Sequence, residues 1–93
     1  MTIPTFTWDD GVNGYLSEPL EIEDMAIVRL ELSSRAPVVT LKKEDDGGYA
    51  NYGQSPKDYP RHEITVRVTE KTTIRLATPV KVLECQIIGG VGV

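Results

Sequence analysis

The stretch that most constrains the fold is residues 62–88, in which apolar and polar side chains alternate. Ile64, Val66 and Val68 are each separated by one polar residue, and Ile74 and Leu76 repeat this pattern a few positions later. A period of two residues is typical of a strand with one buried face and one exposed face. Most of these apolar residues are β-branched, which strands favour. The stretch therefore predicts at least two strands that contribute to one core.

A third run, at residues 80–88, changes phase. Pro79 ends the run before it, because proline has no N–H group to donate to a sheet. Within the third run, Val82 has one parity, whereas Leu83 and Cys85 have the other. A β-bulge near Val82 would turn both sets toward the core, and a strand buried on both faces would do the same. The sequence leaves both alternatives open.

The connection at residues 70–72 decides how the first two strands are related. A two-residue turn at Glu70 and Lys71 would place Val68 and Ile74 on opposite faces, because directly paired residues share a face. A three-residue loop would place Val68 and Ile74 on the same face, but residues 70–72 lack the glycine that such loops favour. The other solution is an arch whose two strands lie in different sheets. The missing glycine favours the arch, which would imply a sandwich.

Short strand patterns separated by turn residues recur along the 93 residues. This spacing predicts a single all-β domain over residues 1–93, an antiparallel β-sandwich or jelly roll of about seven to eight short strands. Residues 1–8 are expected to form an extended arm or edge strand, because Pro4 is tolerated only at a sheet edge. Residues 89–93 are a glycine-rich tail that either frays or adds a strand to a neighbouring subunit. The side chains predicted to be buried are Val28, Leu30, Ile64, Val66, Val68, Ile74, Leu76 and Leu83.

Charge is distributed unevenly along the chain. The net charge is −4, and residues 1–24 carry six acidic side chains and no basic one. An acidic chain without a basic cluster argues against nucleic-acid binding, and no apolar run is long enough to span a membrane. No secretory signal is recognisable, so we expect synthesis in the cytoplasm. The uneven charge either favours head-to-tail contacts between copies or reflects a solvated acidic loop.

No combination of residues indicates a catalytic site, a cofactor or a metal. His62 is expected to be solvated, and Cys85 is expected to be a buried free thiol. Asp9, Asn13 and Gly14 fit part of a calcium loop, but its third position lacks an oxygen ligand and its twelfth lacks the bidentate glutamate. Two pairs of carboxylates, Asp9 with Asp10 and Asp45 with Asp46, could in principle serve glycoside hydrolysis, which needs two carboxylates across a cleft. Both pairs lie in turns, which so short a chain cannot easily enclose in a cleft. We therefore predict that the protein is not an enzyme.

The longest stretch without a strand pattern is residues 49–61, which contains three of the four tyrosines. Together with the preceding turn it would make a loop of about 16 residues, and loops of that length are usually functional or mobile. Tyrosine and tryptophan rings serve well in contact surfaces, although one or two tyrosines could instead cap the end of the sandwich. The predicted partner-binding residues are Phe6, Trp8, Tyr49, Tyr52 and Tyr59.

The segment PVVTLKKEDDGGY, residues 37–49, is a proline-led strand that runs into an Asp-Gly-Gly hairpin. In this general style the chain resembles small all-β virion proteins of tailed phages, such as capsid decoration, head-fibre or tail components. The resemblance implies a location in the virion and a trimer or other homo-oligomer that binds another virion protein. It implies no cofactor and carries over no site residues.

A small carbohydrate-binding module is the alternative function. Sandwich domains often host such modules, in which sugars stack on the faces of aromatic rings. In this chain Trp8, Tyr49, Tyr52 and Tyr59 would have to form the stacking platform. The absence of a recognisable signal peptide counts against this alternative.

Overall fold

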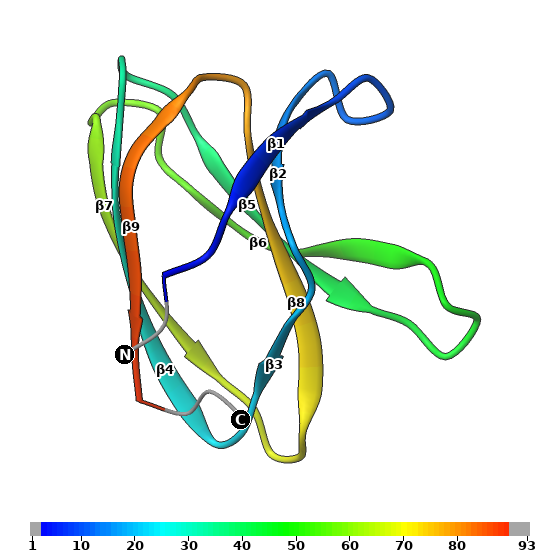
Figure 1. The fold of residues 1–93 in the computed structure, drawn as a ribbon. Coiled ribbons are helices and arrows are strands. Elements are labelled where there is room, and N and C mark those ends of the chain that lie inside the picture. Colours follow the sequence, from blue (N-terminus) through cyan, green and yellow to red (C-terminus); the bar gives the residue numbers. More distant parts are fainter. Residues whose placement is uncertain (1–2, 90–93) are drawn as a thin grey trace.

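The computed structural model describes residues 3–89 (Figure 1). In this range nine strands form two antiparallel sheets that face each other, which confirms the predicted all-β sandwich. The described residues contain no helix long and apolar enough to cross a membrane. The strands are β1 (Phe6–Asp9), β2 (Gly14–Ser17), β3 (Leu20–Ile22), β4 (Met25–Leu32), β5 (Val38–Lys43), β6 (Tyr49–Ser55), β7 (Arg61–Arg67), β8 (Thr72–Thr78) and β9 (Val82–Ile88).

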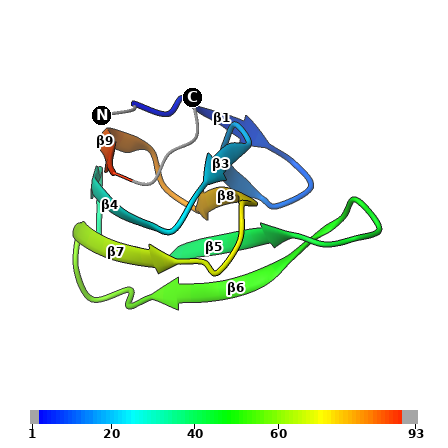
Figure 2. The ribbon, with the colours of Figure 1, turned by 90° about the horizontal axis from the view of Figure 1, so that it is seen from below.

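The smaller sheet, which we call sheet A, has the strand order β7-β4-β9. The larger sheet, sheet B, has the order β1-β2-β8-β5-β6, and β3 pairs with β8 as well. Figure 2 views the molecule from below and separates β4 and β9 of sheet A from β5, β6 and β8 of sheet B. Strands that follow each other in sequence therefore often lie in different sheets, as β6, β7, β8 and β9 do in turn.

Alternate residues of the two sheets meet in one core. Leu30 of β4 and Leu76 of β8 belong to the same cluster of buried side chains. Burial of each such aliphatic side chain contributes about 1.5–3 kcal/mol. The prediction of burial is confirmed for Val28, Leu30, Val66, Ile74 and Leu76, whereas Ile64 and Val68, on or just after the edge strand β7, are half-buried.

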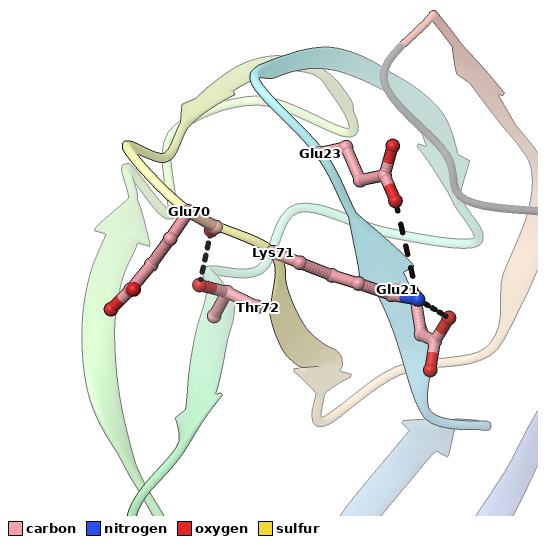
Figure 3. Close-up of polar contacts among 5 residues, drawn as sticks. All are labelled: Glu21, Glu23, Glu70, Lys71 and Thr72. Carbon is pink, nitrogen blue, oxygen red and sulfur yellow. Dashed lines mark hydrogen bonds and ion pairs between the residues drawn. The ribbon is translucent and has the colours of Figure 1, made fainter.

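Residues 70–72 form the arch and not the hairpin, because β7 lies in sheet A and β8 in sheet B. The hydroxyl of Thr72 donates to the carbonyl oxygen of Glu70 at 2.9 Å. The Nζ atom of Lys71 lies 3.1 Å from Glu21 in β3 and 4.0 Å from Glu23 just after it (Figure 3). The hydrogen bond to Glu21, and then the attraction of its charge, raises the pKa of Lys71. The ion pairs of Lys71 with Glu21 and Glu23 thus connect the arch to β3, and the arch contains no glycine turn.

The change of phase in the last run is a β-bulge. Glu31 of β4 pairs with Glu84, but the next residue of β4 pairs with Val82, so Leu83 is the extra residue. The bulge is confirmed, with Cys85 buried on the inner side. The prediction that Leu83 is buried is wrong, because its side chain is 57% exposed. A bulge leaves its extra residue unpaired, so that this residue can point away from the core.

Two strands, β2 and β6, lie where the sequence shows no strand pattern. β6 falls inside the stretch predicted to be irregular, and only residues 56–60 separate it from β7. The prediction of a loop of about 16 residues is therefore wrong. Within the described residues β6 pairs with β5 alone, and most of its side chains are exposed or half-buried. A strand that buries so little surface needs no apolar alternation, which explains why the pattern does not reveal it.

The β5–β6 hairpin extends away from the body of the sandwich (Figure 1). Its turn is closed by the N–H group of Glu44, which donates to the carbonyl oxygen of Gly48 at 2.7 Å. Gly47 has a φ of 90°, a conformation that glycine adopts without strain. The expected Asp-Gly-Gly hairpin is therefore present, and it continues into β6.

One buried serine completes the sheet where β2 gives way to β3. Both strands pair with the same edge of β8, but the pairing of β2 ends at Leu16 opposite Ala77, and the pairing of β3 starts at Leu20 opposite Ile74. In the gap, the Oγ atom of Ser17 accepts the N–H group of Leu76 at 2.9 Å. A side chain thus replaces a strand-to-strand hydrogen bond.

Candidate interaction surfaces

The outer face of sheet A carries an apolar cluster. Ile27 of β4 pairs with Ile88 of β9, and Met25 lies two positions away on the same face of β4. Met25 is 40% exposed and Ile88 is 38% exposed, while Ile27 is half-buried. The exposed face of an antiparallel sheet is normally polar. These three side chains, the apolar cluster, therefore present apolar surface where polar surface is expected.

The other end of the same face is charged. The Nε atom of Arg29 lies 2.9 Å from the carboxylate of Glu63, and that of Arg61 lies 3.7 Å from Glu31. Both pairs join directly opposed positions of β4 and β7. Exposed ion pairs of this kind contribute only about 0.2–1 kcal/mol to stability. Their more important consequence is that both signs of charge lie next to the apolar cluster.

A groove of about 820 Å³ is lined by the N-terminal arm together with β4, β7 and β9. Ile3 and Phe6 contribute from the arm, and Leu83 contributes from the bulge of β9. The side chains of Ile3 and Leu83 are both exposed. The bulge therefore adds a second apolar element to the surface around sheet A.

His62 is buried, with 7% of its surface exposed, so the expectation that it is solvated is wrong. It faces inward from β7 opposite Leu30. Its Nδ1 atom shares a hydrogen bond with the Oγ atom of Ser55 on β6 at 2.5 Å, and its Nε2 atom is buried without a partner among the described residues. The alternation through Ile64, extended back by two residues, would have placed His62 on the inner side. Its visible role is to link β7 to β6.

The two predicted partner-binding residues of the arm lie on β1, at one edge of sheet B. Phe6 is half-buried against the core. Trp8 is 51% exposed and meets Tyr15 edge to face, with 5.3 Å between the ring centroids. Its indole N–H group donates to the carboxylate of Asp10 at 2.7 Å. Trp8 is therefore held in a fixed position with part of its surface accessible.

The three tyrosines lie on or after β6, at the opposite edge of sheet B. Tyr49 is half-buried, with the guanidinium carbon of Arg75 5.7 Å from its ring centroid. The hydroxyl of Tyr52 donates to the carbonyl oxygen of Arg67 at 2.9 Å, so this side chain bridges β6 and the end of β7. Tyr52 thus links β6 to the end of β7 while 47% of its surface stays exposed. Tyr59 is exposed in the loop that follows β6.

The structure does not bring the four candidate sugar-stacking rings together. β1 and β6 are the two outer strands of the five in the order β1-β2-β8-β5-β6. Trp8 therefore lies at one edge of sheet B, and Tyr49 and Tyr52 lie at the other. A single stacking platform would need these rings on one surface.

The acidic turn between β1 and β2 is stabilised from within. The Oδ1 atom of Asp9 accepts the N–H group of Gly11 at 2.7 Å, and Asp10 accepts the indole N–H group of Trp8. In residues 3–89 no group of three or more His, Cys, Asp or Glu side chains is placed to hold a metal ion. The carboxylates of the turn therefore have identified partners within the chain.

Cys85 is a buried free thiol, which confirms the prediction. Its burial raises its pKa to about 12. The reactive form of a cysteine is the thiolate, so this side chain stays protonated and unreactive at neutral pH. It contributes to the core and not to a surface.

No family model, curated protein or solved structure matches the chain. The candidate surfaces are therefore identified by geometry and composition. They are the outer face of sheet A, with its apolar cluster, and the projecting edge of β6. Sequence patterns missed the first because they do not show which sheet face another layer covers.

Proposed function

We propose that this protein is a non-enzymatic structural protein that acts through protein–protein contacts as a homo-oligomer. Its proposed setting is the virion of a tailed phage, as a capsid decoration or head/tail accessory protein that binds another virion protein. The observation that carries the proposal is the apolar cluster of Met25, Ile27 and Ile88 on the outer face of sheet A.

The composition of that face supports a protein interface. The core of an interface is apolar and depleted in charge, and its rim is polar and accessible. Here the apolar cluster lies beside the charged pairs of Arg29 with Glu63 and of Arg61 with Glu31. Exposed apolar patches that are rimmed by polar residues mark protein–protein contact sites.

Sedimentation equilibrium of the full chain tests the oligomer. Ile88→Glu places a charge in the apolar cluster and is expected to weaken self-association. Val12→Glu makes the same chemical change at an exposed position in the turn between β1 and β2, and should leave self-association unchanged. A wild-type chain that remains monomeric at its highest soluble concentration would contradict the oligomer.

The virion setting has its own test. Genes of virion proteins lie next to one another in phage genomes, so the genes that flank this coding sequence should encode capsid or tail proteins. Mass spectrometry of particles purified from the same phage should then detect the chain in a fixed ratio to the major capsid protein. Flanking genes for metabolic enzymes, or particles without the chain, would refute this setting while leaving the oligomer intact.

A further inference from the structure

The edge strands of this sandwich differ in how they are protected. An exposed edge presents unpaired N–H and C=O groups, and charged side chains on the edge discourage pairing with another chain. β1 contains Asp9, β3 contains Glu21, β9 contains Glu84, and β7 contains three charged residues. β6 has the sequence YANYGQS, with neither a charge nor a proline. Among the described edges, β6 alone lacks this protection.

The backbone of β6 is oriented for a second partner. In an antiparallel ladder, hydrogen-bonded and non-hydrogen-bonded residue pairs alternate. The hydrogen bond from Glu44 to Gly48 shows which pairs of the β5–β6 ladder are of each kind. Counting along the register, Ala50 is in a hydrogen-bonded pair with Lys42, whereas Tyr49 and Asn51 are in non-hydrogen-bonded pairs. The N–H and C=O groups of Tyr49 and Asn51 therefore point away from β5.

The bulge in β6 does not remove this edge. The register with β5 shifts between Thr40 and Leu41, which makes Tyr52 the extra residue. That shift directs Tyr52 toward β7, where its hydroxyl bonds to Arg67. The run from Tyr49 to Asn51 precedes the bulge and lies on the hairpin that projects from the sandwich (Figure 1).

From these features we infer that β6 pairs antiparallel with β6 of a second copy, about a two-fold axis. An uncharged strand meets its own copy without like-charge repulsion, and the projection of the hairpin keeps the two sandwiches apart. Antiparallel pairing also brings the acidic turn, with Asp45 and Asp46, toward the segment after β6 of the other copy. That segment, residues 56–60, carries one base, Lys57, and one acid, Asp58, so it adds no net negative charge opposite the acidic turn.

This inference rests on the proposed function, since it names one surface through which the copies would meet. Asn51→Lys adds a charge to the unprotected edge and is expected to weaken dimerisation about tenfold, equivalent to roughly 1.4 kcal/mol. Thr7→Lys is the matched control, because it makes the same charge change at an exposed position of the edge strand β1, away from β6 and from the outer face of sheet A. It is expected to change the dissociation constant less than twofold.

A backbone variant gives a second test. Asn51→Pro removes an N–H group that points away from β5, so it should abolish pairing while the β5–β6 ladder persists. Circular dichroism would show whether each variant keeps the wild-type fold. In the wild type, hydrogen exchange at the amides of Tyr49 and Asn51 should slow as the protein concentration rises.

The outcomes separate the two proposals. Weakening by Asn51→Lys but not by Thr7→Lys, with concentration-dependent protection of the two amides, supports β6 pairing. Wild-type association that neither Asn51 variant affects overturns β6 pairing and leaves the proposed oligomer standing. A monomeric wild type overturns both.

Discussion

Removing the hydroxyl of Ser17 should destabilise the protein well beyond what a serine-to-alanine change normally does. Ser17 is completely buried, and its Oγ atom accepts the N–H group of Leu76 at 2.9 Å and donates to the carbonyl oxygen of Glu18 at 3.0 Å. Neither β2 nor β3 pairs with Leu76, which lies between the two ladders. In Ser17→Ala the N–H group of Leu76 would stay buried without its acceptor.

The expected magnitude follows from that unpaired group. A buried donor that loses its partner costs about 1–3 kcal/mol. For a domain of this size each kcal/mol lowers the melting temperature by roughly 4–8 °C, so a loss of about 2 kcal/mol corresponds to roughly 10 °C. The hydrogen bond from Nε of Arg75 to the carbonyl oxygen of Ser17 would remain, because it uses the backbone.

Equilibrium unfolding in urea measures this loss. Ser17→Ala should lower the unfolding midpoint without changing the slope, since the surface exposed on unfolding is the same. Ser34→Ala is the matched control, because Ser34 is exposed, and it should stay within about 0.5 kcal/mol of the wild type. If Ser17→Ala matched Ser34→Ala in stability, the side chain would not be the acceptor that completes the β8 edge.

Three further predictions test the packing. Gly14→Ala should cost about 1–3 kcal/mol, since a Cβ atom there would lie 2.6 Å from the last carbonyl oxygen of β8. Gly53→Ala, with no atom within 4 Å of the added carbon, is its control, and equal losses in thermal unfolding would contradict the clash. Ile87→Ala should cost about 2–5 kcal/mol, whereas Leu83→Ala at the bulge should stay within about 0.5 kcal/mol. Chemical denaturation distinguishes them, and a large loss for Leu83→Ala would mean that the bulge is misplaced. The thiol of Cys85 should resist a thiol-reactive dye at pH 8 until the protein is unfolded, because its pKa is raised to about 12. Because the thiol ionises near pH 9 in the unfolded chain but only near pH 12 in the folded one, the free energy of unfolding should fall as the pH rises from about 9 toward 12. Rapid labelling of the native protein would show that the thiol is accessible.

Residues 62–88 show how much of the fold can be predicted from the alternation of apolar and polar residues alone. Period-two spacing located β7 and β8, and the missing glycine at residues 70–72 pointed to the arch that the structure contains. The same pattern left two alternatives for the third run, a bulge near Val82 and a strand buried on both faces, and the structure has the bulge. The pattern did not show which residue of the bulge would point away from the core, because that depends on the pairing with the neighbouring strand β4 and not on the spacing of apolar residues alone. Leu83 is outside for that reason.

The candidate surfaces depend on tertiary structure more strongly than the strands of residues 62–88 do. Phe6, Trp8, Tyr49, Tyr52 and Tyr59 are recognisable from the sequence as contact residues, yet strand order places them at two opposite edges of sheet B. The hydroxyl of Tyr52 bridges β6 and the end of β7, which no local sequence pattern predicts. Conversely, Met25 has the outward parity of Arg29, but only the structure groups it with Ile27 and Ile88 on a face that no layer covers within residues 3–89.

The sequence by itself determined the all-β class, most of the strands and the inward set of β4, β7 and β8, because each depends on the local alternation of side chains. The tertiary structure decided which strands are edges, that β2 and β6 exist at all, and that a serine completes the β8 ladder. These depend on hydrogen bonds between segments far apart in the chain. An edge strand such as β6 is specified by its partner β5 and not by its own side chains, which is why its unprotected backbone became visible only in the folded protein.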